Sequence, residues 1–268
     1  MKKILLAILV IFIGNLCFAA DPVKVDFNDG IYHITVTGDK IKKKIKFISS
    51  ESLITNSEAH KANPDAILTI NAGFFDPDNG KSISYVVTDS ITSEDPHFNE
   101  NLLNNPELRQ NLTKILNRTE FRILECSSEK DLKYAIVPHN TSADFSCFIK
   151  TSAQGGPLIL PQLRLEEEFF VVKKDGKVIR ESASVLHKTA RTIIGLKGDK
   201  LHILIITDKH PMDLYEVQKY CKDLGLTRAM AFDGGSSTSF NYKDKIEVVS
   251  TEENSTGRSV KSFMQITK

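Results

Sequence analysis

Short apolar segments separated by glycine turns recur along this chain and limit its fold more than any other feature. Ala66–Ile70 is a continuous apolar run, which is typical of a strand that is covered on both faces. Arg191–Gly195 begins a second strand, which turns at Gly198-Asp199 into Leu201–Thr207. Because such segments dominate, we expect an α+β fold with mixed, largely antiparallel sheets and a few packed helices.

Several local elements follow from the same patterns. One helix is predicted to begin at His210-Pro211, with Pro211 in its first turn, and Leu214, Val217, Cys221 and Leu224 keep a helical stripe up to Gly225. Hairpins are predicted around Gly38-Asp39, joining Ile31–Thr37 to Ile41–Ile48, and around Asp175-Gly176. The remaining expected elements are a helix over Pro106–Asn117, strands at Ile83–Thr88, Phe121–Cys126, Leu132–Val137, Leu158–Leu160 and Phe240–Tyr242, and a pair formed by Ile246–Val249 before Val260–Ile266 closes the chain.

The first twenty residues read as an export signal. Lys2 and Lys3 precede the apolar run Ile4–Ile13, and Cys17–Ala20 offers small residues for cleavage. We therefore expect residues 1–20 to be a signal peptide, 21–268 to be one catalytic domain with 91–151 as a less typical elaboration, and the mature protein to be secreted or periplasmic without a stable membrane anchor. Removing the two lysines changes the formal net charge from +1 to −1. A chain so close to neutral has no overall electrostatic field that would attract nucleic acid.

The cysteines fit an exported chain. Cys126, Cys147 and Cys221 remain after processing, so at least one is unpaired within the chain. Cys126 and Cys147 are the expected pair under oxidising conditions. Cys221 lies on the apolar side of the predicted helix, and we expect a buried thiol. No Cys/His spacing indicates zinc.

Asp233-Gly-Gly-Ser-Ser-Thr238 is the stretch with the most chemical content. It follows the apolar strand Arg228–Phe232, so a strand delivers one carboxylate to a turn of small residues. Gly234 and Gly235 allow a tight turn that presents N–H groups, and three hydroxyls follow. A carboxylate beside anion-binding donors suits chemistry on a negatively charged group. The plainer reading is a β-turn with polar caps.

Three further motifs repeat this design, in which a strand ends and small residues expose the backbone. They are Asn71-Ala-Gly-Phe-Phe75, Gly155-Gly-Pro157 and Arg191-Thr-Ile-Ile-Gly195. Functional groups collect on such loops because a rigid sheet holds them in register. We therefore expect the four motifs to meet at one site.

These motifs, in this order, resemble those of the phosphodiester glycosidase family. The family typically shows Asn-Gly-Gly-Phe-Phe, a Gly-Gly-Pro-Leu strand, Arg-Thr-Ala-Ile-Gly, and Asp-Gly-Gly-Gly-Ser-Thr after a helix that ends in Leu-Gly. The resemblance covers Ala66–Ile266 and is weakest between Ile91 and Thr151; Gly257–Val260 also resembles a closing Arg-Xaa-Val. Ala72 and Ser236 stand where the family has glycine, so the substrate pocket can differ.

The resemblance implies an exported hydrolase that cleaves the glycosidic C–O bond of a sugar-1-phosphate diester in a glycan or envelope polymer, similar to an N-acetylglucosamine-1-phosphodiester. A departing phosphate monoester is a stable anion, so cations and N–H groups can replace a second carboxylic acid. We assign the catalytic roles to Asp233, as acid–base or nucleophile, and to Arg191, on the phosphate. The substrate-binding assignments are Asn71, Gly73, Phe75, Asp76, Gly155, Gly156, Gly234, Gly235, Ser236, Ser237 and Thr238.

Several of these residues have competing roles. Arg191 can form a structural ion pair with Asp233, one of Phe74 and Phe75 is expected in the core, and Asp76 can be a plain Asp-Pro turn residue. His187 and His210 are proton-shuttle candidates or structural side chains. The sequence requires no cofactor, and a divalent cation on Asp76, Asp78 and Asp233 lacks the spacing of a defined metal loop.

Two other functions stay open. A noncatalytic module for envelope glycans or phosphorylated sugars would use the same anion pocket without turnover. A serine hydrolase would use Ser236 or Ser237 as nucleophile, but Gly235–Ser239 lacks the Gly-Xaa-Ser-Xaa-Gly elbow. The sequence determines neither the oligomeric state nor the sugar.

Overall fold

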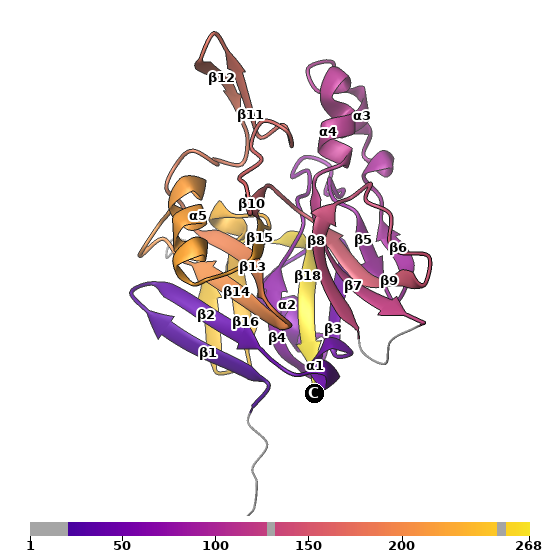
Figure 1. Cartoon of the computed structure of the whole chain (residues 1–268), viewed down its shortest axis with the longest axis vertical. Coiled ribbons are helices and arrows are strands. Elements are labelled where there is room, and N and C mark those ends of the chain that lie inside the picture. Colours follow the sequence, from indigo (N-terminus) through magenta and orange to yellow (C-terminus); the bar gives the residue numbers. More distant parts are fainter. Residues whose placement is uncertain (1–20, 128–131, 251–255) are drawn as a thin grey trace, which may run out of the picture.

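The computed structural model describes residues 21–127, 132–250 and 256–268, so the signal-peptide prediction lies outside the described residues. Three antiparallel sheets form the body of the molecule (Figure 1). The six-stranded sheet has the order β1-β2-β14-β13-β15-β10. Its strands are β1 (Val23–Asn28), β2 (Ile31–Val36), β14 (Lys200–Ile206), β13 (Arg191–Lys197), β15 (Arg228–Ala231) and β10 (Leu158–Leu160).

Two five-stranded sheets complete the body. The first has the order β17-β16-β4-β18-β3, with β17 (Ile246–Val249), β16 (Ser239–Tyr242), β4 (Ala66–Asn71), β18 (Val260–Thr267) and β3 (Ile45–Ile54). The second has the order β6-β5-β9-β7-β8, with β6 (Ile91–Glu94), β5 (Val86–Thr88), β9 (Cys147–Gln154), β7 (Thr119–Cys126) and β8 (Lys133–Pro138). The expected α+β class with largely antiparallel sheets is confirmed.

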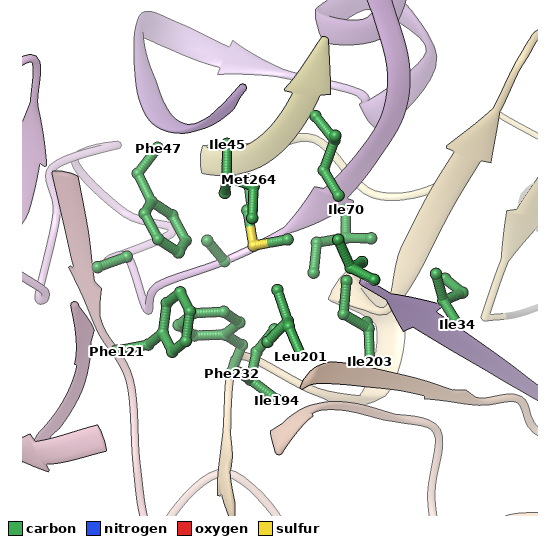
Figure 2. Packing of buried hydrophobic residues seen from close by; sticks show 14 of the residues in the cluster. Ile34, Ile45, Phe47, Ile70, Phe121, Ile194, Leu201, Ile203, Phe232 and Met264 are labelled. Atoms are coloured by element: carbon green, nitrogen blue, oxygen red, sulfur yellow. The ribbon is translucent and has the colours of Figure 1, made fainter. Parts of the chain in front are cut away.

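One hydrophobic core joins the three sheets (Figure 2). Ile194 and Ile203 come from the six-stranded sheet, Phe47 and Met264 from the first five-stranded sheet, and Phe121 from the second. Rings interlock at its centre in edge-to-face contacts with Phe47, a favourable aromatic geometry. The β7–β9 part of the 91–151 segment is therefore packed into the main body.

Few helices accompany the sheets. Among the described residues the α-helices are α1 (Asp39–Lys42), α2 (Asn56–Lys61), α3 (Glu100–Asn104), α4 (Leu112–Leu116) and α5 (Leu214–Asp223). The short 3-10 helices are η1 (Pro96–Phe98), η2 (Arg109–Asn111) and η3 (Gly235–Ser237). In the described part of the chain no helix is both long and apolar enough to cross a membrane.

Two arms extend from the same end of the body (Figure 1). We call the segment with α3 and α4 the helical arm, and the two-stranded hairpin of β11 (Val171–Lys174) and β12 (Lys177–Glu181) the hairpin arm. Leu102 and Ile115 of the helical arm and Phe169, just before the hairpin, form one small buried cluster at their bases. The arms therefore meet where they leave the body.

Most predicted elements are present, but the first hairpin is wrong. β2 pairs with β1 and β14, whereas Asp39–Lys42 forms α1 and β3 lies in another sheet. A turn of helix buries Ile41 in the core, which a two-residue hairpin turn could not do.

Two predicted helices begin or divide differently from the expectation. α5 begins at Leu214 with a capping box made by Asp213 and Glu216, rather than at His210-Pro211. The single helix expected over Pro106–Asn117 is divided into η2 and α4.

The cysteine expectations hold. A disulfide joins Cys126 at the end of β7 to Cys147 at the start of β9, so it ties two neighbouring strands of one sheet. Cys221 is a buried thiol in α5, and burial raises its pKa to about 12.

Candidate active site

Asp233 is held where two of the sequence motifs meet. Its N–H donates to Ala72 O at 3.0 Å, and Asn71 Nδ2 donates to its carbonyl oxygen at 2.6 Å. The carbonyl oxygen of the Asn71 side chain also accepts from Thr192 Oγ1 at 2.7 Å and from Ser239 N at 3.2 Å. Asn71 is fully buried. It therefore ties the ends of β4, β13 and β15 together, and its hydrogen bonds go to the protein rather than to a cavity.

The carboxylate of Asp233 opens onto a cavity of about 300 Å³ at the base of the two arms. The cavity has three arginines and a mostly apolar wall. Its described lining residues are Phe74, Phe75, Pro77, Ile83, Leu102, Leu108, Ile115, Arg118, Phe170, Arg180, Ser182, Ala183, Asp233 and Arg258. Both phenylalanines of the first motif therefore reach the cavity.

The environment of Asp233 favours its neutral form. Burial raises the pKa of the carboxyl group to about 6, while the Ser237 hydroxyl, the Arg258 charge and the Gly234 N–H act in the opposite direction. The Ser237 hydroxyl is near the carboxylate, although it makes no well-aligned hydrogen bond to any described residue. A carboxyl group with a pKa near 6 changes protonation state close to neutral pH, as general acids and bases require.

Arg258 is the cation that most directly influences Asp233. It lies just before β18, with its guanidinium 5.0 Å from the ring centre of Phe75. Its Nη1 donates to Ser236 Oγ at 3.3 Å. Arg258 belongs to the Arg-Xaa-Val part of the family resemblance, but it is not among the site residues that the motifs predict.

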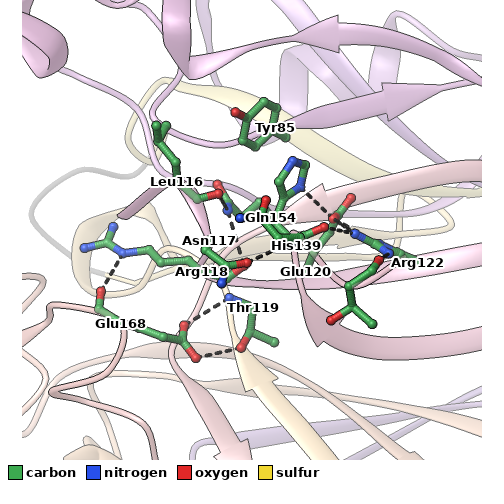
Figure 3. A network of polar contacts seen from close by, with 12 residues as sticks. Tyr85, Leu116, Asn117, Arg118, Thr119, Glu120, Arg122, His139, Gln154 and Glu168 are labelled. Atoms are coloured by element: carbon green, nitrogen blue, oxygen red, sulfur yellow. Dashed lines mark hydrogen bonds and ion pairs between the residues drawn. The ribbon is translucent and has the colours of Figure 1, made fainter. Parts of the chain in front are cut away.

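Arg118 and Arg180 were missed because they belong to no motif. Arg118 lies 3.9 Å over the ring of Phe170. Its Nε donates to Glu168 O at 3.1 Å (Figure 3). Burial lowers the pKa of Arg118 to about 10, so it stays charged at neutral pH. Arg180 of β12 donates to Phe169 O at 2.9 Å. The two guanidinium groups come from opposite arms onto one cavity.

A buried carboxylate supports the position of Arg118. Glu168 accepts hydrogen bonds from Thr119 N at 3.0 Å, Thr119 Oγ1 at 2.7 Å and Leu158 N at 3.0 Å (Figure 3). Burial raises its pKa despite these bonds. Glu168 O accepts from Arg118 Nε, so the Glu168 carboxylate fixes both the strand that follows Arg118, β7, and the segment that orients the Arg118 side chain.

The expected role of Arg191 needs correction. Its guanidinium is buried and donates to the carbonyl oxygens of Met212, Ala183, Ser184 and His187 at 2.6–3.3 Å. Four of its five N–H groups are thus engaged, and it is absent from the described cavity lining. Arg191 lies next to Gly234 in space, but it fixes the 183–187 loop instead of facing an anion.

The glycines at positions 73, 155 and 156 also serve packing more than substrate binding. A side chain at Gly73 would press on Ser84 and Gln154 O, one at Gly155 on Ala231 O, and one at Gly156 on Glu168 Oε2. The N–H groups of Gly155 and Gly156 donate to Thr119 O and Ala231 O. These positions let strands approach closely, and their donors are used inside the protein.

The turn after Asp233 forms η3, which uses most of its own donors. Gly235 N donates to Ala190 O, Ser237 N to Gly234 O and Thr238 N to Gly235 O. The side chains of Ser237 and Thr238 are fully buried, and Ser236 is exposed. The predicted row of free N–H groups is therefore not formed, and the cationic groups around the cavity are the three arginines.

Asp76 behaves as a turn residue. One of its carboxylate oxygens accepts from Asp78 N at 2.9 Å, and both residues border a different hollow near Glu100. Within residues 21–127, 132–250 and 256–268, no group of three His, Cys, Asp or Glu side chains is arranged to hold a metal ion.

The histidine candidates lie elsewhere. His187 Nδ1 is 3.1 Å from Glu181 Oε1, and His210 Nδ1 is 2.9 Å from Asp29 Oδ2. Neither lines the described cavity. The Ser236 hydroxyl contacts Arg258, and no described histidine forms a hydrogen bond with it. A serine nucleophile with a histidine base has no geometric support in the described chain.

Comparison with known proteins gives a family match over most of the chain. The family model for phosphodiester glycosidase matches residues 64–267. No curated protein matches the chain.

Three solved structures are similar in fold. The catalytic domain of zebrafish N-acetylglucosamine-1-phosphodiester alpha-N-acetylglucosaminidase, auto-inhibited by its pro-peptide, has 14% identity and a TM-score of 0.66, over 92% of this chain and 81% of that one. A hypothetical protein from Synechocystis has 14% identity and a TM-score of 0.55, over 92% of this chain and 64% of that one. A Burkholderia pseudomallei K96243 protein named "Putative exported protein" has 11% identity and a TM-score of 0.63, over 89% and 74%.

Proposed function

The chain belongs to the phosphodiester glycosidase family, and we propose that it hydrolyses the glycosidic C–O bond of a sugar-1-phosphate diester in the cavity at Asp233. The observation that supports this most is the composition of that cavity, whose described lining holds one carboxyl group and three arginines. A cationic cavity suits a phosphodiester, and a single carboxyl group suffices when the leaving group is a stable anion.

In the proposed reaction the bond between the anomeric carbon and the bridging oxygen breaks, and the electron pair leaves with the phosphate monoester. Arg258, Arg118 and Arg180 stabilise the second negative charge that develops on that phosphate. Water supplies the hydroxyl group of the released sugar. Arg258 replaces Arg191 in the assignment that the sequence suggested, because its guanidinium borders the cavity.

Asp233 acts on the sugar side of this bond, either as a nucleophile toward the anomeric carbon or as the acid–base group that handles the proton of water. Its pKa of about 6 makes a required ionised form distinguishable from a required acid form. A nucleophile or base requires the ionised form, so activity rises with pH through about 6, whereas a required acid gives the opposite trend.

The decisive experiment incubates wild type, Asp233→Asn and Asp76→Asn with UDP-GlcNAc and a panel of sugar-1-phosphate diesters, and measures free reducing sugar. Wild type and Asp76→Asn should release sugar from at least one diester, and Asp233→Asn should be slower by at least about 10²-fold. Release from none of the diesters, or equal release by Asp233→Asn, would refute the proposal. Binding without release would identify a glycan-binding module instead.

We also propose that the protein acts outside the cytoplasm, in the periplasm or the extracellular space. The disulfide between Cys126 and Cys147 supports an oxidising compartment, as does the export signal read from the sequence. Fractionation of the producing cells, followed by blotting, tests this: protein confined to the cytosolic fraction would contradict it.

A further inference from the structure

We propose that the cavity at Asp233 receives an aliphatic aglycone, so that the substrate is a glycosyl-1-phosphate diester whose second alcohol carries a hydrocarbon chain. This inference rests on the proposed function and specifies its substrate class. It comes from the wall of the cavity, which differs from a wall suited to a second sugar.

Beyond Asp233 and the three arginines, the cavity offers little to the hydroxyl groups of a second sugar. Apart from Asp233 and the three arginines, its described lining is apolar with the exception of Ser182. A buried hydroxyl group that loses water without gaining a hydrogen-bond partner is costly. A hydrocarbon chain has no such requirement and gains free energy from each apolar group that it buries.

The arginines are built into this apolar wall. Arg118 covers the ring of Phe170 at 3.9 Å, and Arg258 lies 5.0 Å from the ring centre of Phe75. A guanidinium that lies over a ring is covered on its face, while its N–H groups point outward from its edge. Such a wall presents donors for a phosphate directly beside aromatic surface. That combination matches a phosphate ester of an aliphatic alcohol.

The two arms supply the side chains that would contact the chain. Leu102, Leu108 and Ile115 come from the helical arm, and Arg180 comes from the hairpin arm (Figure 1). At roughly 30 Å³ for a water-sized group, a volume of about 300 Å³ holds on the order of ten groups. The phosphate and the sugar carbon at which Asp233 acts take up part of that space. Only the first few methylene groups of the aglycone therefore fit inside, and a longer chain would leave between the arms.

The test measures binding of methyl, butyl, hexyl and octyl phosphate to the full chain by isothermal titration calorimetry below their micelle concentrations. For wild type, the Kd should fall up to about fourfold per methylene group and level off near hexyl phosphate. The heat-capacity change of binding should become more negative with chain length. Equal Kd values for methyl and hexyl phosphate would overturn the proposal.

Two matched variants test where the hydrocarbon chain binds. Leu108→Asn alters a lining residue, whereas Leu112→Asn alters a partly buried leucine of the same cluster that is not in the lining. Leu108→Asn should keep methyl phosphate binding and lose most of the dependence on chain length; Leu112→Asn should keep both. An unchanged dependence in Leu108→Asn, or an equal loss in both variants, would overturn the proposal. Thermal unfolding confirms that both variants are folded.

These measurements do not depend on turnover, so the two proposals can fail separately. Chain-length dependence without hydrolysis of any diester would refute only the proposed function. Hydrolysis of diesters with no preference for a longer alkyl group, together with equal Kd values, would refute only the aliphatic aglycone.

Discussion

The ionised carboxyl group of Asp233 lowers the free energy of unfolding at neutral pH, and replacing Asp233 with asparagine should remove this destabilisation. The carboxyl pKa is about 6 in the folded chain, against an ordinary value of 3.8. The difference is about two pKa units at about 1.4 kcal/mol each, which amounts to about 3 kcal/mol. This is an upper bound for Asp233→Asn, because the substitution also removes the attraction to Arg258 and one acceptor oxygen.

The sign follows from proton binding. Between pH 3.8 and about 6 the folded state holds a proton at Asp233 that the unfolded state has released, so stability falls as pH rises through this window. Above pH 6 the loss is complete. Asp233→Asn lacks this titration, so it should match wild type near pH 4 and exceed it by up to about 3 kcal/mol at pH 7–8.

Urea unfolding of both proteins from pH 4 to pH 8 measures this difference. Asp26→Asn is the control, because Asp26 is an exposed residue of β1 and should change stability by less than about 0.5 kcal/mol. If Asp233→Asn were no more stable than wild type at pH 8, or if the difference did not vary with pH, the raised pKa that we infer for this carboxyl group would be refuted.

Three other substitutions test the remaining geometry. Arg258→Gln should move the pH–rate inflection of Asp233 upward from about 6, because the Arg258 charge lowers that pKa. An unchanged inflection would show that Arg258 does not influence the Asp233 carboxyl group. Arg191→Ala should lower the free energy of unfolding, measured in urea, by at least about 2 kcal/mol, because it removes the donors for four carbonyl groups. A variant that is stable but inactive would instead support a catalytic role for Arg191. Gly156→Ala should lower the free energy of unfolding by about 1–3 kcal/mol more than Gly176→Ala, as measured by thermal unfolding. Both glycines have positive φ, but only at Gly156 would the added methyl group meet a neighbouring carboxylate oxygen. Equal losses of stability would contradict the packing described.

Local patterns were sufficient to predict most strands and the meeting of two motifs. Asn71 and Asp233 are 162 positions apart, yet both end apolar runs that lie in the centre of the molecule, and a direct hydrogen bond joins them. The first hairpin was mispredicted because Ile31–Val36 and Ile45–Ile54 suit any strand partner, and only tertiary packing places them in different sheets.

The cations of the site could not be derived in the same way. Arg118 and Arg180 reach the cavity through the placement of two arms, and no spacing in the sequence relates them to Asp233. Arg191 had the right neighbours but the wrong orientation, because the 183–187 loop surrounds its guanidinium with carbonyl oxygens. Which atoms a long side chain reaches depends on loops whose course the sequence pattern does not determine.

The position of β18 has a consequence for how this protein is made. β18 follows every other strand of its sheet in the sequence, yet it lies between β3 and β4, and Arg258 lies two residues before its first residue. A ribosome must therefore deliver the chain through β18 before that sheet can close. A product terminated before Val260 would expose two unpaired strand edges and lack a cation of the cavity, so premature stop codons should yield aggregating, inert fragments.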